Sequence, residues 1–196
     1  MEVLFVNKNW FPSSLVAALI LNCAPAFAGP AADPAKSELG WRDSSGHFRA
    51  ASENCLSRDN FGALLLLTAD GSLWSRWSSL PGDKEPTISE LTKAKRNQPI
   101  FVPVVFANPL ADSKGNVNVT CVFSVRRPDG IVRHPPKAVL WQGKAVSPAN
   151  CLYLGAARCA YVVEEGDPPG RYIVFANVQD NNRHLELNLR KSFVIE

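Results

Sequence analysis

Residues 171–196, which read RYIVFANVQDNNRHLELNLRKSFVIE, decide the fold class of this 196-residue chain. Along residues 171–179 the apolar side chains fall on both parities, which is typical of a strand inside a sheet. The polar run 180–183 then turns the chain. In residues 184–196 five apolar side chains share one parity, which predicts a long strand with one buried face. They are Leu185, Leu187, Leu189, Phe193 and Ile195.

Working outward, residues 117–127 form a second alternating stretch. Apolar side chains occupy its odd positions from 117 to 125 and polar ones most of its even positions, so we expect a strand whose odd side chains point inward. Pro128-Asp129-Gly130 follows, where proline fixes φ and glycine permits a positive φ. Residues 131–133 resume extended chain, and the whole segment therefore predicts a β-hairpin.

Shorter apolar runs complete the pattern. They cover residues 64–68, 100–107, 138–142, 151–154 and 159–165. Pro103 restricts the second run to an edge, a bulge or a strand start. Turns rich in proline, glycine and asparagine separate the strands at intervals of roughly 8 to 15 residues, which is typical of an antiparallel sandwich. The chain is therefore predicted to be all-β.

One short helix is expected at residues 72–80. Apolar side chains recur within it at helical spacing, and Asp70 or Ser72 can cap its first turn. Pro81 then stops it.

The first 28 residues predict a signal peptide. Lys8 precedes an unbroken apolar run at 15–21, and Ala26-Phe27-Ala28 has the small-x-small pattern of a cleavage site. The alternatives are an uncleaved anchor, although the run is shorter than the roughly 18 apolar residues that spanning needs, and a lipoprotein acylated at Cys23. We expect residues 1–28 to be removed, which leaves a periplasmic or secreted protein without a membrane span.

Composition divides the remaining chain into two parts. Residues 29–60 are rich in small and polar residues without periodicity, so they are predicted to be a flexible lead-in, and residues 61–196 are predicted to form the β-sandwich domain.

The chain is 46% hydrophobic and 20% charged, which excludes collagen-like, disordered and polytopic membrane proteins. The net charge of +3 comes from interspersed residues, so no nucleic-acid partner is expected.

Four cysteines remain after the predicted cleavage: Cys55, Cys121, Cys151 and Cys159. An even number in an oxidising compartment predicts two disulfides, for which three pairings are possible. Cys121 and Cys159 fall on the expected inward parity, which favours a Cys121–Cys159 bridge and joins Cys55 to Cys151. A local bridge from Cys151 to Cys159 is the alternative. A zinc site is not expected, because no Cys-x-x-Cys pair occurs.

The segment GDPPGRYIVFANVQDN (166–181), followed by HLELNLRKSFVIE (184–196), resembles the last two strands of bacterial immunoglobulin-like or macroglobulin-type modules. In such modules an Asp-Pro-x-Gly-x-Tyr turn enters a strand and a polar hairpin follows. LRKSFVIE (189–196) and the RRPDG hairpin (126–130) look like small uncharacterised secreted proteins of Gram-negative bacteria. The resemblance implies an immunoglobulin-like β-sandwich over about residues 61–196, and it implies no functional residue.

The sequence contains no convergent catalytic motif. Its three histidines lie in separate contexts without metal-binding spacing; they are His47, His134 and His184. Nucleophile-elbow, phosphate-loop and dinucleotide patterns are absent. Glu164, Glu165 and Asp167 beside a proline-rich turn offer a calcium site as the alternative to a solvated loop. We therefore expect no catalytic residue, no metal and no cofactor.

Two features offer a binding surface. Trp74 and Trp77 share one face of the expected helix, where they either pack onto the sandwich or dock a partner. Basic side chains flank the 128–130 turn and make a cationic tip suited to a carboxylate-bearing or phosphorylated surface; they are Arg126, Arg127, Arg133 and His134. We predict a non-catalytic binding or accessory module whose partner is an envelope protein or a glycan.

Two alternatives stay open. The first is an extracytoplasmic enzyme whose site combines distant residues, which a pocket gathering histidines with carboxylates would favour. The second is a subunit of a surface assembly that exchanges a strand, which an unpaired edge near residues 100–107 would favour.

Overall fold

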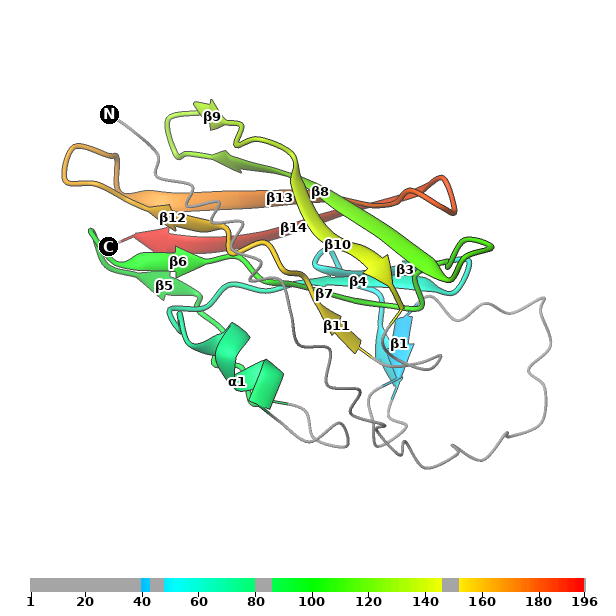
Figure 1. Ribbon diagram of the computed structural model, residues 1–196. Coiled ribbons are helices and arrows are strands. Elements are labelled where there is room, and N and C mark those ends of the chain that lie inside the picture. Colours follow the sequence, from blue (N-terminus) through cyan, green and yellow to red (C-terminus); the bar gives the residue numbers. More distant parts are fainter. Residues whose placement is uncertain (1–39, 43–47, 80–85, 146–151, 196) are drawn as a thin grey trace.

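The computed structural model describes four stretches of the chain: residues 40–42, 48–79, 86–145 and 152–195. They contain many strands and one short helix, so the all-β class is confirmed (Figure 1). The predicted signal peptide lies outside the described residues. No helix in the described part of the chain is long and apolar enough to cross a membrane.

The longest strands form one sheet, here called the large sheet. Its members are β5 (Lys93–Ala94), β8 (Asn116–Arg126), β9 (Val132–Arg133), β10 (Ala138–Lys144), β13 (Gly170–Asp180) and β14 (Leu185–Ile195). Their order is β10-β8-β13-β14-β5, with β9 beside β8. The expected inner strand at residues 171–179 is confirmed, because β13 pairs with β8 on one side and with β14 on the other. The expected hairpin is confirmed by the pairing of β8 with β9.

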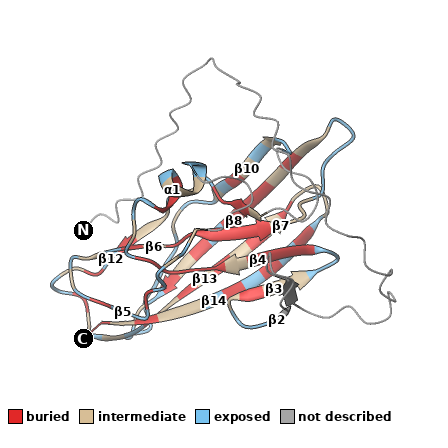
Figure 2. Ribbon diagram, turned by 90° about the horizontal axis from the view of Figure 1, so that it is seen from below, coloured by how far each residue is buried: buried red, intermediate tan, exposed pale blue. Residues whose placement is uncertain are grey.

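A second sheet, here called the small sheet, faces the large one. It contains β3 (Cys55–Arg58), β4 (Phe61–Leu65), β7 (Val104–Ala107) and β11 (Leu152–Leu154), in the order β11-β7-β4-β3. The large and small sheets enclose the main core, and buried side chains alternate along their strands (Figure 2). The alternate side chains along each strand of the large sheet therefore point away from the core and form an outer face.

Part of the predicted lead-in forms a strand. β3 pairs with β4, and its Cys55 is buried, so residues 55–58 belong to the small sheet. Further upstream, β1 (Gly40–Arg42) pairs with β2 (Phe48–Ala50). Such short strands carry too few side chains to show a period, and pairing across the sheet supplies their backbone hydrogen bonds.

Pro103 splits the apolar run at residues 100–107 into two strands. β6 (Pro99–Phe101) pairs with β12 (Ala160–Val162) in a two-stranded sheet, whereas β7 joins the small sheet. Because β7 is paired with both β4 and β11, the unpaired edge considered for strand exchange is not found there.

The helix forms where it is expected. α1 (Leu73–Ser79) begins after Asp70, whose carboxylate accepts the amide of Ser72 at 2.8 Å. It packs on the far side of the small sheet through a second apolar cluster, which consists of Leu66, Leu73, Trp74, Val105 and Leu154.

The cysteines differ from expectation. Cys121 on β8 is fully buried, and Cys159 packs against the main core just before β12. Both are thiols in this structure, so the expected Cys121–Cys159 bridge is not formed here. Burial favours the neutral thiol, which does not attack a second sulfur. Cys151 lies outside the described residues. The two pairings expected for it, with Cys55 or with Cys159, therefore involve a residue that the structure does not describe.

Candidate functional site

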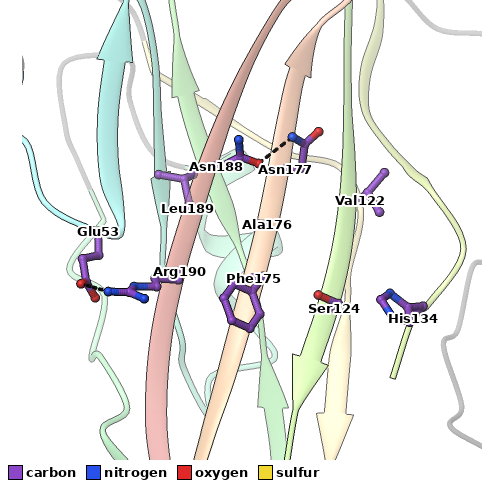
Figure 3. Close-up of a pocket in the computed structure, with 10 residues that line it drawn as sticks. All are labelled: Glu53, Val122, Ser124, His134, Phe175, Ala176, Asn177, Asn188, Leu189 and Arg190. Atoms are coloured by element: carbon purple, nitrogen blue, oxygen red, sulfur yellow. Dashed lines mark hydrogen bonds and ion pairs between the residues drawn. The ribbon is translucent and has the colours of Figure 1, made fainter. Parts of the chain in front are cut away.

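The outer face of the large sheet carries a shallow hollow of about 600 Å³, here called the outer-face hollow (Figure 3). Its lining comes from β8, β13 and β14, with one residue before β3 and one after β9. The lining residues are Glu53, Val122, Ser124, His134, Phe175, Ala176, Asn177, Asn188, Leu189 and Arg190. The sheet is thus the floor, and two loop residues are the walls.

Strand register places two rows of side chains across this floor. In one row, Phe175 of β13 lies between Ser124 of β8 and Arg190 of β14. In the next row, Asn177 lies between Val122 and Asn188 in the same way. Side chains in aligned positions of neighbouring antiparallel strands are close enough to interact directly, so each row acts as one surface.

The second row belongs to a chain of hydrogen-bonded amides, here called the amide ladder: Asn177, Gln179 and Asn188. The Asn177 amide donates to Asn188 Oδ1 at 2.8 Å and to the Glu186 carboxylate at 3.0 Å. Gln179 donates to Asn177 Oδ1 at 2.8 Å and itself accepts from Lys137. These bonds hold the amide planes in fixed orientations.

Some polar groups of the floor have no partner within the described residues. Asn188 uses its side-chain oxygen in the ladder, but its NH₂ group donates to no described atom. The Ser124 hydroxyl likewise makes no hydrogen bond with the described part of the chain. The floor therefore presents at least two donors and one hydroxyl acceptor to solvent.

Phe175 gives the floor a flat apolar surface. Its ring is half-buried in the sheet, and the Arg126 guanidinium lies 5.7 Å from the ring centroid. A cation at this distance is attracted to the face of the ring. Arg126 is thus oriented by the aromatic side chain beside the hollow.

The two walls come from different residues. The Glu53 carbonyl accepts the Arg190 amide at 2.7 Å, and the Glu53 carboxylate accepts the Arg190 guanidinium. This side-chain bond lowers the pKa of Glu53 and raises that of Arg190, so both remain charged and neutralise each other. His134 lies on the opposite side of the floor (Figure 3).

The two tryptophans expected to offer a docking face belong mainly to the interior. Trp74 is 7% exposed, and its indole N–H donates to the Gly155 carbonyl at 2.8 Å. Trp77 packs partly against the second apolar cluster. Packing, rather than partner docking, therefore accounts for the spacing of these residues.

The cationic tip is divided by the fold. Arg127 is ion-paired with Asp129 at 2.8 Å and with Asp167 at 2.6 Å, and only 11% of its side chain is exposed. Arg133 is exposed at the tip, whereas Arg126 lies over Phe175. The expected cluster is therefore not one anion-binding surface.

The acidic turn is engaged by arginines. Arg96 donates to the carbonyls of Glu164, Glu165 and Asp167 at 2.8, 3.0 and 2.6 Å. Because the Asp167 carboxylate already pairs with Arg127, the calcium alternative loses its best ligand. The described residues contain no group of three or more His, Cys, Asp or Glu side chains arranged to hold a metal.

The histidines are not gathered into a pocket with carboxylates. His134 and Glu53 occupy opposite walls of the outer-face hollow. His184 lies in the turn between β13 and β14 with a φ of 55°, and His47 lies outside the described residues. The arrangement that would favour a dispersed active site is thus not found in the described structure.

Sequence reasoning placed Phe175 and Asn177 on a strand but gave them no role. Their shared outward parity is visible in the sequence. Their alignment with Ser124 and Asn188 depends on strand register, which no local pattern encodes.

Comparisons with known proteins add little. No family model matches the chain, and no curated protein matches it. A solved structure of a family 123 glycoside hydrolase from Clostridium perfringens, described for the hydrolysis of glycolipid glycans, is similar to part of the chain, with a TM-score of 0.40 and 11% identity. The match covers 70% of this chain and 27% of that one. A likeness of this degree supports neither a fold nor a function.

Proposed function

We propose that this protein is a non-catalytic binding module that holds a glycan in the outer-face hollow. The observation that carries the proposal is the placement of the Phe175 ring and the amide ladder side by side on one floor. The frame would be an immunoglobulin-like β-sandwich, supported by two facing sheets around one core, in which every strand pair except the parallel β14–β5 pair is antiparallel. The N-terminal pattern supports a periplasmic or secreted location.

The chemistry of the floor suits a sugar ring. One face of a pyranose is lined by C–H groups that pack on a flat aromatic side chain, while its edge carries hydroxyls that both donate and accept. Phe175 provides the flat surface, and Asn188 and Ser124 provide unengaged polar groups next to it. A few fixed polar groups around an apolar surface are typical of small-ligand sites.

The lack of net charge on the floor also favours a neutral polar ligand. The charged groups at the Glu53 wall neutralise each other, and the residues in the middle of the floor are amides, a hydroxyl and apolar side chains. Arg126, the exposed cation beside the hollow, lies over the Phe175 ring and is not among the lining residues, so the lining itself offers hydrogen-bond partners suited to hydroxyls.

Binding to a glycan array, followed by calorimetric titration of the oligosaccharide retained, tests the proposal. Phe175→Ala is expected to weaken binding at least about tenfold, since it removes the stacking surface. Asn188→Ala is expected to weaken it by about threefold to thirtyfold. Val139→Ala, an exposed change on the neighbouring β10 outside the hollow, serves as the matched control and should leave binding unchanged.

Equal glycan binding by the Phe175→Ala variant would contradict the assignment of the site. If no glycan is retained but an envelope protein binds the unmodified chain and not the Phe175→Ala variant, the ligand is a protein and the glycan proposal is wrong.

A further inference from the structure

The outward side chains of β13 continue the polar floor beyond the outer-face hollow. After Phe175 they are Asn177 and Gln179, and Asn181 follows in the turn. Strand geometry places Gln179 about 13 Å from Phe175, since each residue advances the chain by roughly 3.3 Å. A single sugar ring on Phe175 therefore does not reach Gln179. The four residues Phe175, Asn177, Gln179 and Asn181 are here called the outer strip.

The far half of the outer strip has oriented side chains with polar groups to spare. Gln179 donates one N–H within the amide ladder and accepts from Lys137 at 2.8 Å, so its second N–H has no acceptor among the described residues. Asn181 donates to Asn118 Oδ1 at 3.0 Å and to Thr120 Oγ1 at 3.1 Å, and its own side-chain oxygen accepts from no described atom. The strip thus offers a donor and, one row further, an acceptor in fixed orientations.

The charges beside the outer strip balance each other. Glu186 is the β14 neighbour of Gln179, and Lys137 binds Gln179 from the β10 side, so one charge of each sign flanks this row. Beside the hollow, Glu53 and Arg190 form an ion pair. The strip therefore has no net charge along its length, which complements an uncharged ligand.

The two directions along β13 from Phe175 are not equivalent. On one side the Arg126 guanidinium lies 5.7 Å from the Phe175 ring centroid, and the next outward residue of β13 is the apolar Ile173. On the other side lie the amides, from Asn177 to Asn181. An uncharged ligand that packs on Phe175 and extends further thus finds its next hydrogen-bond partners toward Asn181.

We propose that the ligand is an unbranched, uncharged glycan that lies extended along β13 from Phe175 to Asn181. The inference rests on the proposed function, in which the outer-face hollow holds a sugar. One sugar ring packs on Phe175, and the rings that follow hydrogen-bond to Gln179 and Asn181 through their hydroxyl or acetamido groups. Cello-oligosaccharides and chito-oligosaccharides represent this class, because both are straight chains with polar groups along their edges.

The dependence of affinity on chain length tests the inference. Cello- and chito-oligosaccharides of two to six sugar units are titrated calorimetrically into the full chain. In at least one series the dissociation constant is expected to fall at least about tenfold from the dimer to the hexamer, because only longer chains reach Gln179 and Asn181. Equal affinity at all lengths would overturn the extended site and leave the sugar site in the hollow intact. Binding to neither series would overturn the inference, and a branched or charged glycan retained on the array would still uphold the proposed function.

Variants of the far half of the strip separate long from short ligands. Gln179→Ala is expected to weaken binding of the hexamer by about threefold to thirtyfold and to leave the dimer unchanged. Gln179→Glu, which keeps the acceptor for Lys137 and removes the donor, should cause the same selective loss. Phe175→Ala should weaken both lengths.

Gln142→Ala is the matched control for these variants. It removes the same type of side chain from an exposed position on β10, opposite Asn118 and away from β13, and should change neither affinity. Equal losses of dimer and hexamer in both Gln179 variants would show that this residue only supports the amide ladder, which would overturn the extended site.

Discussion

At the scale of single residues, Arg127 determines what the 128–130 hairpin tip can do. Its guanidinium is shared between exposed Asp129 and buried Asp167, and its Nε is buried without a partner in the described structure. A charge enclosed in this way is compensated inside the molecule and is not offered to a ligand. The apparent basic cluster in the sequence is therefore mainly a structural ion pair.

Removing the buried partner should be costly. Asp167→Ala is expected to lower the free energy of unfolding by about 2–4 kcal/mol, because it leaves Arg127 incompletely compensated and removes the acceptor for the Glu164 amide. Asp129→Ala, at the exposed end of the same guanidinium, should cost less than about 1 kcal/mol. Urea denaturation of both variants measures the difference, and equal losses would show that Asp167 has no special role.

At the scale of elements, the helix contributes to the stability of the fold more than to a binding surface. α1 is only seven residues long, so it depends on the cluster beneath it for its stability. Trp74 fixes the helix to Gly155, which lies in the connection between β11 and β12. Gly155 is tightly packed, since a Cβ there would lie 2.9 Å from the Leu140 side chain.

The two tryptophans of this helix should differ sharply on truncation. Trp74→Ala is expected to cost about 3–5 kcal/mol, because it empties a buried site and leaves the Gly155 carbonyl unpaired. Trp77→Ala should cost less than about 2 kcal/mol, as that side chain is only partly covered. Thermal unfolding followed by circular dichroism checks the order. A larger loss for Trp77 would refute it.

The strands determine the outer face through their register, which fixes the side chains that lie next to one another. β13 presents its buried side chains to the core and Phe175 and Asn177 to the outer face. A shift of one residue against β8 would exchange the two sets and turn Asn177 and Gln179 into the core, where burial of their amides is costly. The same burial that stabilises the sheet therefore fixes the floor of the outer-face hollow.

At the scale of the whole molecule, the enclosed core limits stability in alkali. Tyr161 and Tyr172 lie with Phe193 in one aromatic group, and burial raises the pKa of Tyr161 to about 12. The pKa of Tyr172 is also raised, again mainly by burial. Because burial disfavours the charged phenolate, ionisation of either phenol would destabilise the folded state.

Because both tyrosine pKa values are raised by folding, the stability of the protein depends on pH in alkali. Below pH 10 both states hold the phenolic protons, and the contribution of Tyr161 is complete. Between pH 10 and about pH 12 the unfolded chain loses its proton first, so stability falls as pH rises. Denaturant titrations across this window should show a smaller fall for Tyr161→Phe than for the unmodified chain. An identical fall would exclude Tyr161 as a cause.

Much of the fold was accessible from the sequence because parity and turn chemistry are local. The inner strand at 171–179, the long closing strand, the hairpin and the helix all follow from side-chain periods and from proline or glycine at defined places. The errors have physical causes as well. β3 and β1 are too short to show a period, and Pro103 divides a single apolar run between two sheets.

The sequence by itself determined an all-β chain, the inward set of side chains and the candidate cysteines, since each depends on residue type and spacing along the chain. Only the tertiary structure decided that Trp74 and Arg127 are internal contacts and that Phe175, Asn177 and Asn188 share one floor. Those facts depend on which strands become neighbours and in what register, and long-range packing, not local pattern, fixes both.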